Sequence, residues 1–283
     1  MTSDPRRPKG MSGRILYALV LERRVRVVVV EMTGPAEELR RRHNLGPAAA
    51  RLASEGLVAA ALLSSQIKGE ERHSVNLYGE EPRFELMVDL WGDGRLRARF
   101  QPGEIEEVSR FRGILAVLKF LGSEELYRGV AEVVDEPIDA ALQRYFQTSV
   151  QIQNRIRVQA ATNAEGRVVF AAGLLIEPLP GVDLSALHTS LDPAMEQDFR
   201  ALITGVAFGQ LAGEPMELLE AVDYWYVCQC SQERVESMLR ALGLEELRTM
   251  LAEDHGAEVT CNFCNERYHL NANQLEALIQ SLS

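Results

Sequence analysis

The chain has 283 residues, an apolar fraction of 46% and a formal net charge of −11 at pH 7. This length allows one large domain or two smaller ones, and the apolar fraction is sufficient for a hydrophobic core. Acidic residues dominate the C-terminal third, where 182–227 hold eight acids and one base and 228–283 hold nine acids and four bases. We therefore expect no nucleic-acid partner, because a module that binds phosphates would present a basic surface.

Residues 1–11 are polar and contain Pro5, Pro8 and Gly10, which predicts a disordered tail. The most apolar run after it, 57–63, is too short to span a bilayer, and no run resembles a signal peptide. We therefore expect a cytoplasmic protein without a membrane partner, in a compartment where thiols stay reduced or bound to metal.

Residues 12–180 are predicted to form one α+β domain in which strands outnumber helices. The predicted strands cover 14–21, 25–32, 74–78, 84–91, 95–100, 112–120, 127–134, 155–162 and 167–176. The predicted helices cover 35–43, 47–68 and 136–153. The first two strands and the last two are expected to pair as hairpins.

No arrangement typical of an enzyme occurs in this domain. The sequence lacks G-x-S-x-G, a glycine loop for phosphate and H-E-x-x-H. The five histidines are scattered, and only His255 and His269 lie near the cysteines described below. We therefore predict no catalytic residue and no enzymatic activity.

Residues 181–227 are predicted to be a metastable helical linker. Asp192 and Pro193 are typical of a helix start, and Gly213 of a helix end. Apolar residues follow at helical spacing: Met195, Phe199, Leu202 and Val206. Gly205 and Gly209 lie inside this helix, and each costs ~1 kcal/mol relative to alanine. We therefore expect a helix that depends on docking to the main domain, followed by a second weak helix over 215–221.

All four cysteines of the chain lie between positions 228 and 264, as Cys228-Gln-Cys230 and Cys261-Asn-Phe-Cys264 with 30 residues between the pairs. Two tight pairs of thiols predict a site for one zinc ion with four sulfur ligands and no open position for a substrate. The members of each pair are also close enough in sequence to form a local disulfide if the metal leaves. The spacing alone thus allows a fixed structural zinc site or a redox switch.

Residues 228–283 are predicted to fold around this site as a small zinc-binding module. Ser231 starts a helix that ends at Gly243, a second helix follows, and 259–270 form a hairpin around the second cysteine pair. Asn271 and Gln274 are typical of a capping box for the last helix. Because the core of this module is small, we expect zinc to supply most of its folding free energy, on the order of 10 kcal/mol.

The residues around the cysteines resemble a known family. The runs CQCSQERV (228–235), ALGLEEL (241–247) and EVTCNFCN (258–265), with Tyr268, are similar to the redox-regulated holdase chaperones of the heat-shock protein 33 family. Residues 144–151 and 171–180 add to the resemblance, which extends from about residue 12 to the end.

The resemblance implies a protein that is inactive as a chaperone while reduced and bound to zinc. Oxidation would form the disulfides Cys228–Cys230 and Cys261–Cys264, release zinc, and unfold the module and the linker. The exposed apolar surface would then hold unfolding client proteins without ATP, and the active form would be a homodimer.

Two alternatives from other functional classes follow from the same residues. A zinc-ribbon interaction module with a fixed structural metal would keep its zinc in peroxide. A thiol oxidoreductase using Cys261 and Cys264 would turn over a disulfide substrate. Its reactive pair would be expected at a helix N-terminus after a strand, whereas this pair lies in a predicted hairpin turn.

Overall fold

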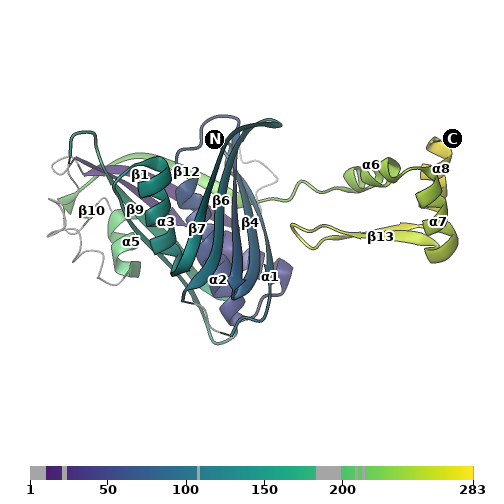
Figure 1. Ribbon diagram of the computed structural model, residues 1–283, viewed down its shortest axis with the longest axis horizontal. Coiled ribbons are helices and arrows are strands. Elements are labelled where there is room, and N and C mark those ends of the chain that lie inside the picture. Colours follow the sequence, from purple (N-terminus) through teal and green to yellow (C-terminus); the bar gives the residue numbers. More distant parts are fainter. Residues whose placement is uncertain are drawn as a thin grey trace. The chain divides into compact units, whose positions relative to one another are not determined.

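Ten strands of the first part of the chain form one mixed sheet, ordered β7-β6-β3-β4-β5-β12-β1-β2-β9-β8 (Figure 1). The computed structural model describes residues 11–20, 24–106, 109–182, 199–207, 210–211 and 214–282. The strands are β1 Ser12–Val20, β2 Val25–Glu31, β3 Glu71–Glu81, β4 Arg83–Trp91, β5 Arg95–Pro102, β6 Phe111–Leu121, β7 Glu124–Glu136, β8 Arg155–Thr162, β9 Val168–Pro178 and β12 Glu217–Tyr226. Neighbouring strands are antiparallel, except that β12 pairs with β5 in parallel.

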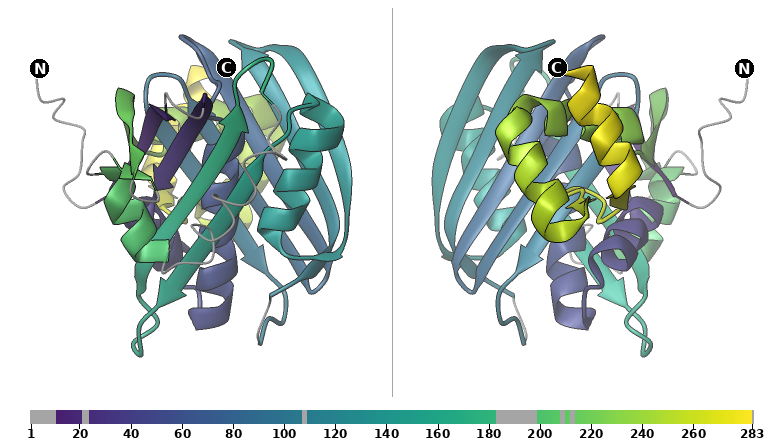
Figure 2. Two further views of the ribbon diagram at one scale, coloured as in Figure 1. Left: turned by 90° about the vertical axis from the view of Figure 1, so that its left-hand side faces the viewer. Right: turned by 90° about the vertical axis from the view of Figure 1, so that its right-hand side faces the viewer.

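Helices cover one face of this sheet, as Figure 2 shows. They are α1 Thr33–His43, α2 Pro47–Leu63 and α3 Ile138–Tyr145. The α2 helix is buried almost all round and packs against β9, β8, β2, β4 and β3. Gly56 permits this close approach, because a Cβ there would lie 2.2 Å from Cδ2 of Leu86 on β4. The main core therefore lies between α2 and the sheet.

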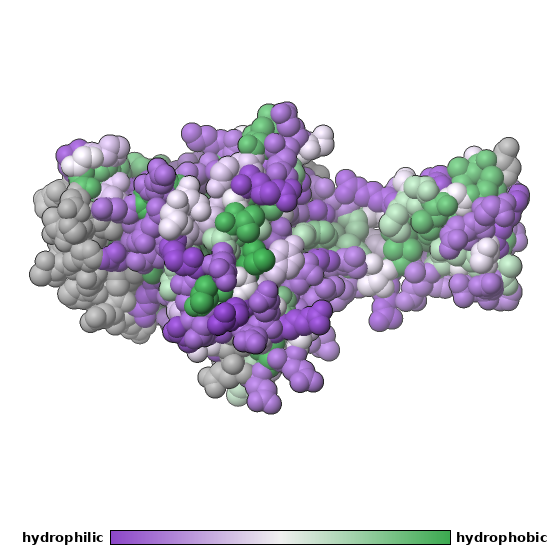
Figure 3. All heavy atoms as spheres, viewed as in Figure 1, coloured by the Kyte–Doolittle hydropathy of each residue, from purple (hydrophilic) through white to green (hydrophobic). Residues whose placement is uncertain are grey.

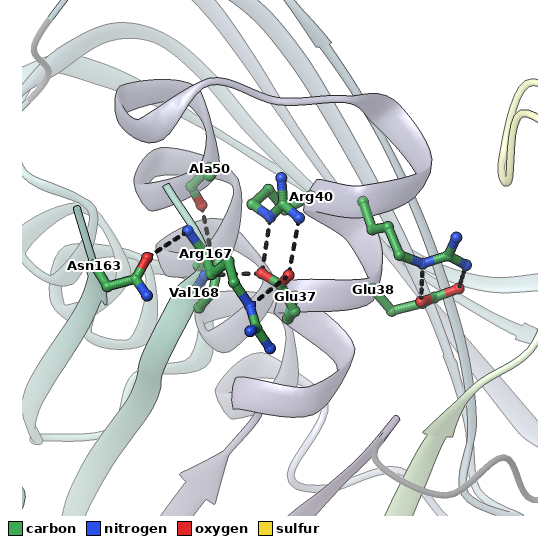
Figure 4. A network of polar contacts seen from close by, with 9 residues as sticks. Glu37, Glu38, Arg40, Ala50, Asn163, Arg167 and Val168 are labelled. Atoms are coloured by element: carbon green, nitrogen blue, oxygen red, sulfur yellow. Dashed lines mark hydrogen bonds and ion pairs between the residues drawn. The ribbon is translucent and has the colours of Figure 1, made fainter. Parts of the chain in front are cut away.

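The α1 helix is tied to the start of β9 by the carboxylate of Glu37 (Figure 4). Glu37 accepts two hydrogen bonds from Arg40 and one from the backbone N–H of Val168 at 2.8 Å. Glu38 is almost fully buried and pairs with Arg41 and Arg42. Burial acts to raise the pKa of Glu38, but the two guanidinium groups lower it overall, so its charge is retained in the fold.

The opposite face of β1, β2 and β9 carries a second apolar cluster, here called the platform. Its members alternate with the core-facing residues along each strand, as the period of a β-strand requires. They are Ala18, Val20, Val25, Val27, Val29, Phe170, Ala172, Leu174 and Ile176. Helix α5, Phe199–Ala207, contributes Phe199 to this cluster, and Ile203 packs against it.

Apolar side chains are also exposed on the strands at the β7 end of the sheet. Ile114 on β6 and Val130 and Val134 on β7 are 39%, 59% and 50% exposed. Figure 3 shows apolar side chains among hydrophilic ones on the side where β4, β6 and β7 lie. In the described ranges, no helix is both long and apolar enough to cross a membrane.

The chain divides into two compact units, Met1–Val227 and Cys228–Ser283. The second contains α6 Gln232–Leu242, α7 Leu244–Asp254, β13 Gly256–Thr260, β14 Arg267–Asn271 and α8 Ala272–Ser281. Its buried core has six residues: Val235, Leu239, Leu247, Leu270, Leu275 and Leu278. Ser231 caps α6, and Asn271 and Gln274 form the capping box of α8, which confirms both predicted helix starts.

The α+β class is confirmed by the mixed sheet with its helices, and both predicted hairpins are present. Two predicted helices are too long. The helix expected over 47–68 ends at Leu63, and the one expected over 136–153 is α3 followed by a π-helical turn, η1 Phe146–Val150. Gln151 ends that turn with φ of 61°, in the left-handed region.

The second linker helix, expected over 215–221, is wrong, because most of this segment belongs to β12. β12 fills the position between β1 and β5, so its backbone groups are satisfied by the sheet rather than by a helix. The first linker helix is present as α5. Its predicted start at Asp192 and Pro193, its glycines 209 and 213, and residues 1–10 of the predicted tail 1–11 lie outside the described residues.

Candidate metal centre

The four cysteines converge from two loops of the second unit. Cys228 and Cys230 lie between β12 and α6, and Cys261 and Cys264 lie in the turn that joins β13 to β14. All four Sγ atoms lie within 4.8 Å of one another. The sulfur of Cys228 is 3.6 Å from that of Cys261, and the sulfur of Cys230 is 3.3 Å from that of Cys264. The structure thus brings together all four predicted sulfurs.

Local hydrogen bonds fix the turn that carries the second cysteine pair. The backbone N–H of Cys261 donates to the carbonyl of Glu266 at 2.9 Å, and that of Asn265 donates to the carbonyl of Cys261 at 2.8 Å. Asn265 has φ of 55°, a left-handed conformation that asparagine tolerates better than most residues. The first pair is anchored immediately after Cys230, where the Ser231 hydroxyl accepts the N–H of Arg234 at 3.3 Å.

The sulfur spacing fits a metal held by four thiolates. A zinc–sulfur bond of about 2.3 Å places tetrahedral sulfurs about 3.8 Å apart, which lies within the range found here. A disulfide requires about 2.05 Å, and all four cysteines are free thiols in this structure. The donor set therefore suits an ion that prefers thiolates, and four protein sulfurs leave no position for a substrate.

The electrostatics of the cluster favour a first thiolate at Cys228. A hydrogen bond from the Cys264 thiol lowers the pKa of Cys228 to about 5, with help from the backbone N–H of Cys230. Burial raises the pKa of Cys230, and donation of its proton to Cys228 raises the pKa of Cys264. Because one negative charge opposes the next, a bound cation would be needed to hold all four as thiolates.

Tyr268 is a neighbour of the sulfurs that the sequence did not identify as a contact. Its hydroxyl donates to Sγ of Cys230 at 3.0 Å, and this hydrogen bond raises the pKa of Tyr268. The two nearby histidines are not in the cluster. His255 places Nδ1 3.3 Å from the carbonyl of Leu251, and the His269 side chain is exposed on β14. Within the part of the chain that the structure describes, the group of potential metal ligands consists of the four cysteines.

Comparisons with known proteins give a consistent result over nearly the whole chain. The 33 kDa chaperonin of Bacillus licheniformis is 29% identical, with 93% of this chain and 98% of that protein covered. The 33 kDa chaperonin of Bacillus subtilis is 27% identical, covering 93% of this chain and 97% of that protein. That of Desulforamulus reducens is 28% identical, covering 96% and 99%.

A solved structure has the same fold. The crystal structure of the 33 kDa chaperonin (heat shock protein 33 homolog) from Thermotoga maritima matches with a TM-score of 0.82 at 22% identity, covering 95% of this chain and 98% of that one. The family model described as Hsp33 protein matches residues 14–271, from β1 to the start of α8 and including all four cysteines. The chain therefore belongs to the Hsp33 protein family.

Proposed function

We propose that this protein is a cytoplasmic, redox-regulated holdase, a chaperone that binds unfolding client proteins without ATP. Its relatives are named chaperonins, which supports a chaperone function and a non-enzymatic role. The main observation in support of the redox switch is that four free cysteine sulfurs lie within 4.8 Å of one another. They lie in a unit whose buried core has only six residues.

The proposed resting state has one zinc ion held by Cys228, Cys230, Cys261 and Cys264. When bound, the ion would supply a cross-link between the two loops and no position for a substrate. Metal binding to such a site is worth on the order of 10 kcal/mol, which is large beside the stability that so small a core provides alone. Loss of the metal is therefore expected to unfold the second unit.

The proposed trigger is a peroxide acting on the thiolates. In each pair the two sulfurs lose two electrons and form one disulfide, while one peroxide takes up two protons and becomes two water molecules. We propose the pairs Cys228–Cys230 and Cys261–Cys264, whose members are separated by only one and two residues. Four thiolates with one zinc dication carry a charge of −2 and two disulfides carry none, so the local charge also changes.

The linker is proposed as the segment 181–227, between a core domain of 12–180 and the cysteine module of 228–283. Within it, α5 has nine residues, too few for a stable isolated helix in water. It is held on the platform by Phe199, which is 1% exposed, and by Ile203. We propose that unfolding of the module releases α5 and uncovers the platform.

The uncovered platform would offer nine small and large apolar residues of three adjacent strands to an unfolded client. Such a surface binds exposed apolar segments without regard to sequence, which suits a holdase. We propose that the oxidised form is a homodimer. We expect no nucleic-acid partner, because the linker and module are acidic.

The test is light scattering of a heat-unfolding client in the presence of this protein. One sample is zinc-loaded and reduced, and the other is treated with peroxide at elevated temperature. Suppression of aggregation only after oxidation supports the proposal, and equal suppression in both states contradicts the switch. No suppression in either state, with zinc retained in peroxide, would favour a zinc-ribbon interaction module with a fixed metal.

A further inference from the structure

The hydroxyl group of Tyr268 is aimed at one of the four sulfurs by the packing of its own ring. Tyr268 lies on β14 opposite Val259 of β13, and both side chains pack against the core of the second unit. This packing fixes the ring, and the hydroxyl oxygen lies 3.0 Å from Sγ of Cys230. The contact therefore depends on the hairpin that also carries Cys261 and Cys264.

The sulfurs differ in the hydrogen-bond donors that they receive. Cys228 receives the backbone N–H of Cys230, and Cys264 receives the backbone N–H of Glu266. Cys230 receives the Tyr268 hydroxyl, a side-chain donor that a single substitution can remove. Backbone donors are common beside metal-bound thiolates and cannot be removed by changing a side chain. Because the donor to Cys230 is a side chain, one substitution can change the hydrogen bonding of this sulfur alone.

A proton donor changes the reactivity of a thiolate in two ways. It stabilises the negative charge on sulfur, so a bound metal competes better with protons for that sulfur. It also withdraws electron density, so the sulfur attacks a peroxide more slowly. In that attack the Cys230 sulfur bonds to one peroxide oxygen and the O–O bond breaks. Hydroxide leaves, and Cys228 then displaces a second hydroxide to form the disulfide.

We propose that Tyr268 is a positioning residue that holds the Cys230 sulfur on the metal and sets the amount of peroxide needed to release it. The inference rests on the proposed function, because it takes zinc and peroxide as the ligand and trigger of the site. It assigns to the hydroxyl group a role in metal retention that is separate from the role of the ring in packing.

The test is Tyr268→Phe, which removes the hydroxyl and keeps the ring. Loss of an outer hydrogen bond to a metal ligand costs about 10–100-fold in metal affinity. We expect at least about a tenfold loss of zinc affinity in competition with a chelator, and about tenfold faster zinc release by peroxide. In the cobalt(II)-loaded protein, the sulfur-to-metal charge-transfer band should move to lower energy, because the thiolate becomes a better electron donor.

The matched control is Val259→Ala on the opposite strand. It removes packing from the same face of the hairpin and leaves the hydroxyl of Tyr268 in place. We expect Val259→Ala to lower the thermal stability of the module while the cobalt band stays unchanged. An altered band in Tyr268→Phe alone would assign the effect to the hydrogen bond.

Wild-type zinc affinity and an unmoved cobalt band in Tyr268→Phe would overturn the proposal. Equal zinc loss in both variants without a band shift would overturn it too, since that pattern reports packing only. If peroxide releases no zinc from the wild-type protein, the redox switch fails. Chelator competition and the cobalt spectrum would still decide the role of Tyr268, so the two failures are distinguishable.

Discussion

Replacing Phe199 by alanine should make the reduced protein active as a chaperone, without oxidation. Phe199 is 1% exposed and belongs to the platform cluster. Its ring meets that of Phe170 edge-on at a centroid distance of 6.1 Å, and the Arg157 guanidinium lies 4.6 Å from its centroid. These contacts attach a helix of only nine residues to the sheet.

The expected size of the effect follows from this burial. Truncation of a buried phenylalanine to alanine costs about 3–5 kcal/mol. Because about 1.4 kcal/mol corresponds to a factor of ten, the docking equilibrium of α5 should shift by at least about 100-fold toward the undocked state. An undocked population of about 1% in the reduced protein would then rise to about half.

The assay uses reduced, zinc-loaded protein throughout. Phe199→Ala should bind an apolar fluorescent dye, be cleaved by protease within 199–207, and suppress client aggregation before any peroxide is added. Thr204→Ala is the matched control, because Thr204 lies exposed in the same helix and its hydroxyl donates to the carbonyl of Arg200 one turn earlier. If reduced Phe199→Ala neither binds dye nor protects the client, docking of α5 does not conceal the client surface.

Three further changes test other parts of the account. Cys261→Ser should lower zinc affinity and leave the second unit unfolded under reducing conditions; circular dichroism and protease resistance equal to wild type would contradict this. Burial raises the pKa of Glu55 to about 7 from its ordinary 4.5. The contribution of Glu55 to the free energy of unfolding is therefore at its full value below pH 4.5 and is lost as the pH rises through 7. The loss amounts to about 3 kcal/mol, and Glu55→Gln should remove it, so the variant is more stable than wild type in urea unfolding at pH 8; an equal pH profile would refute the assignment. Asn271→Ala removes the side-chain carbonyl that accepts the backbone N–H of Gln274 at the start of α8, and it should cost the module about 1 kcal/mol, seen as a lower unfolding temperature at fixed zinc; an unchanged temperature would show that the capping box is not stabilising.

The main domain was largely predictable because its elements have strong local patterns. The valine run of β2 and the Ala/Leu-rich α2 each specify one kind of structure over many residues. β12 was not predictable in this way, since 215–221 contain good helix formers and the partner strand β1 lies about 200 residues away. Leu218 and Leu219 of this segment are about half exposed, whereas Tyr224 and Tyr226 are buried in the sheet.

The four cysteine ligands of the site were predictable from the sequence, but the side chain that contacts them was not. Cysteine spacing indicates which sulfurs converge, because each pair lies in one short loop. Tyr268 was visible in the sequence only as part of a motif. Its contact with Cys230 depends on the register of the β13–β14 hairpin and on the approach of a segment 38 residues away, and neither follows from local spacing. The platform likewise required the order of the strands in the sheet.

The most direct test of the switch is a peroxide titration in which zinc release and client protection are measured on the same sample. Zinc is followed with a metal-binding dye, and protection by light scattering of the heat-unfolding client. The proposed function predicts that both signals rise together over one range of peroxide, with disulfides formed in the same range. Full protection while zinc remains bound, or full zinc release without protection, would contradict it.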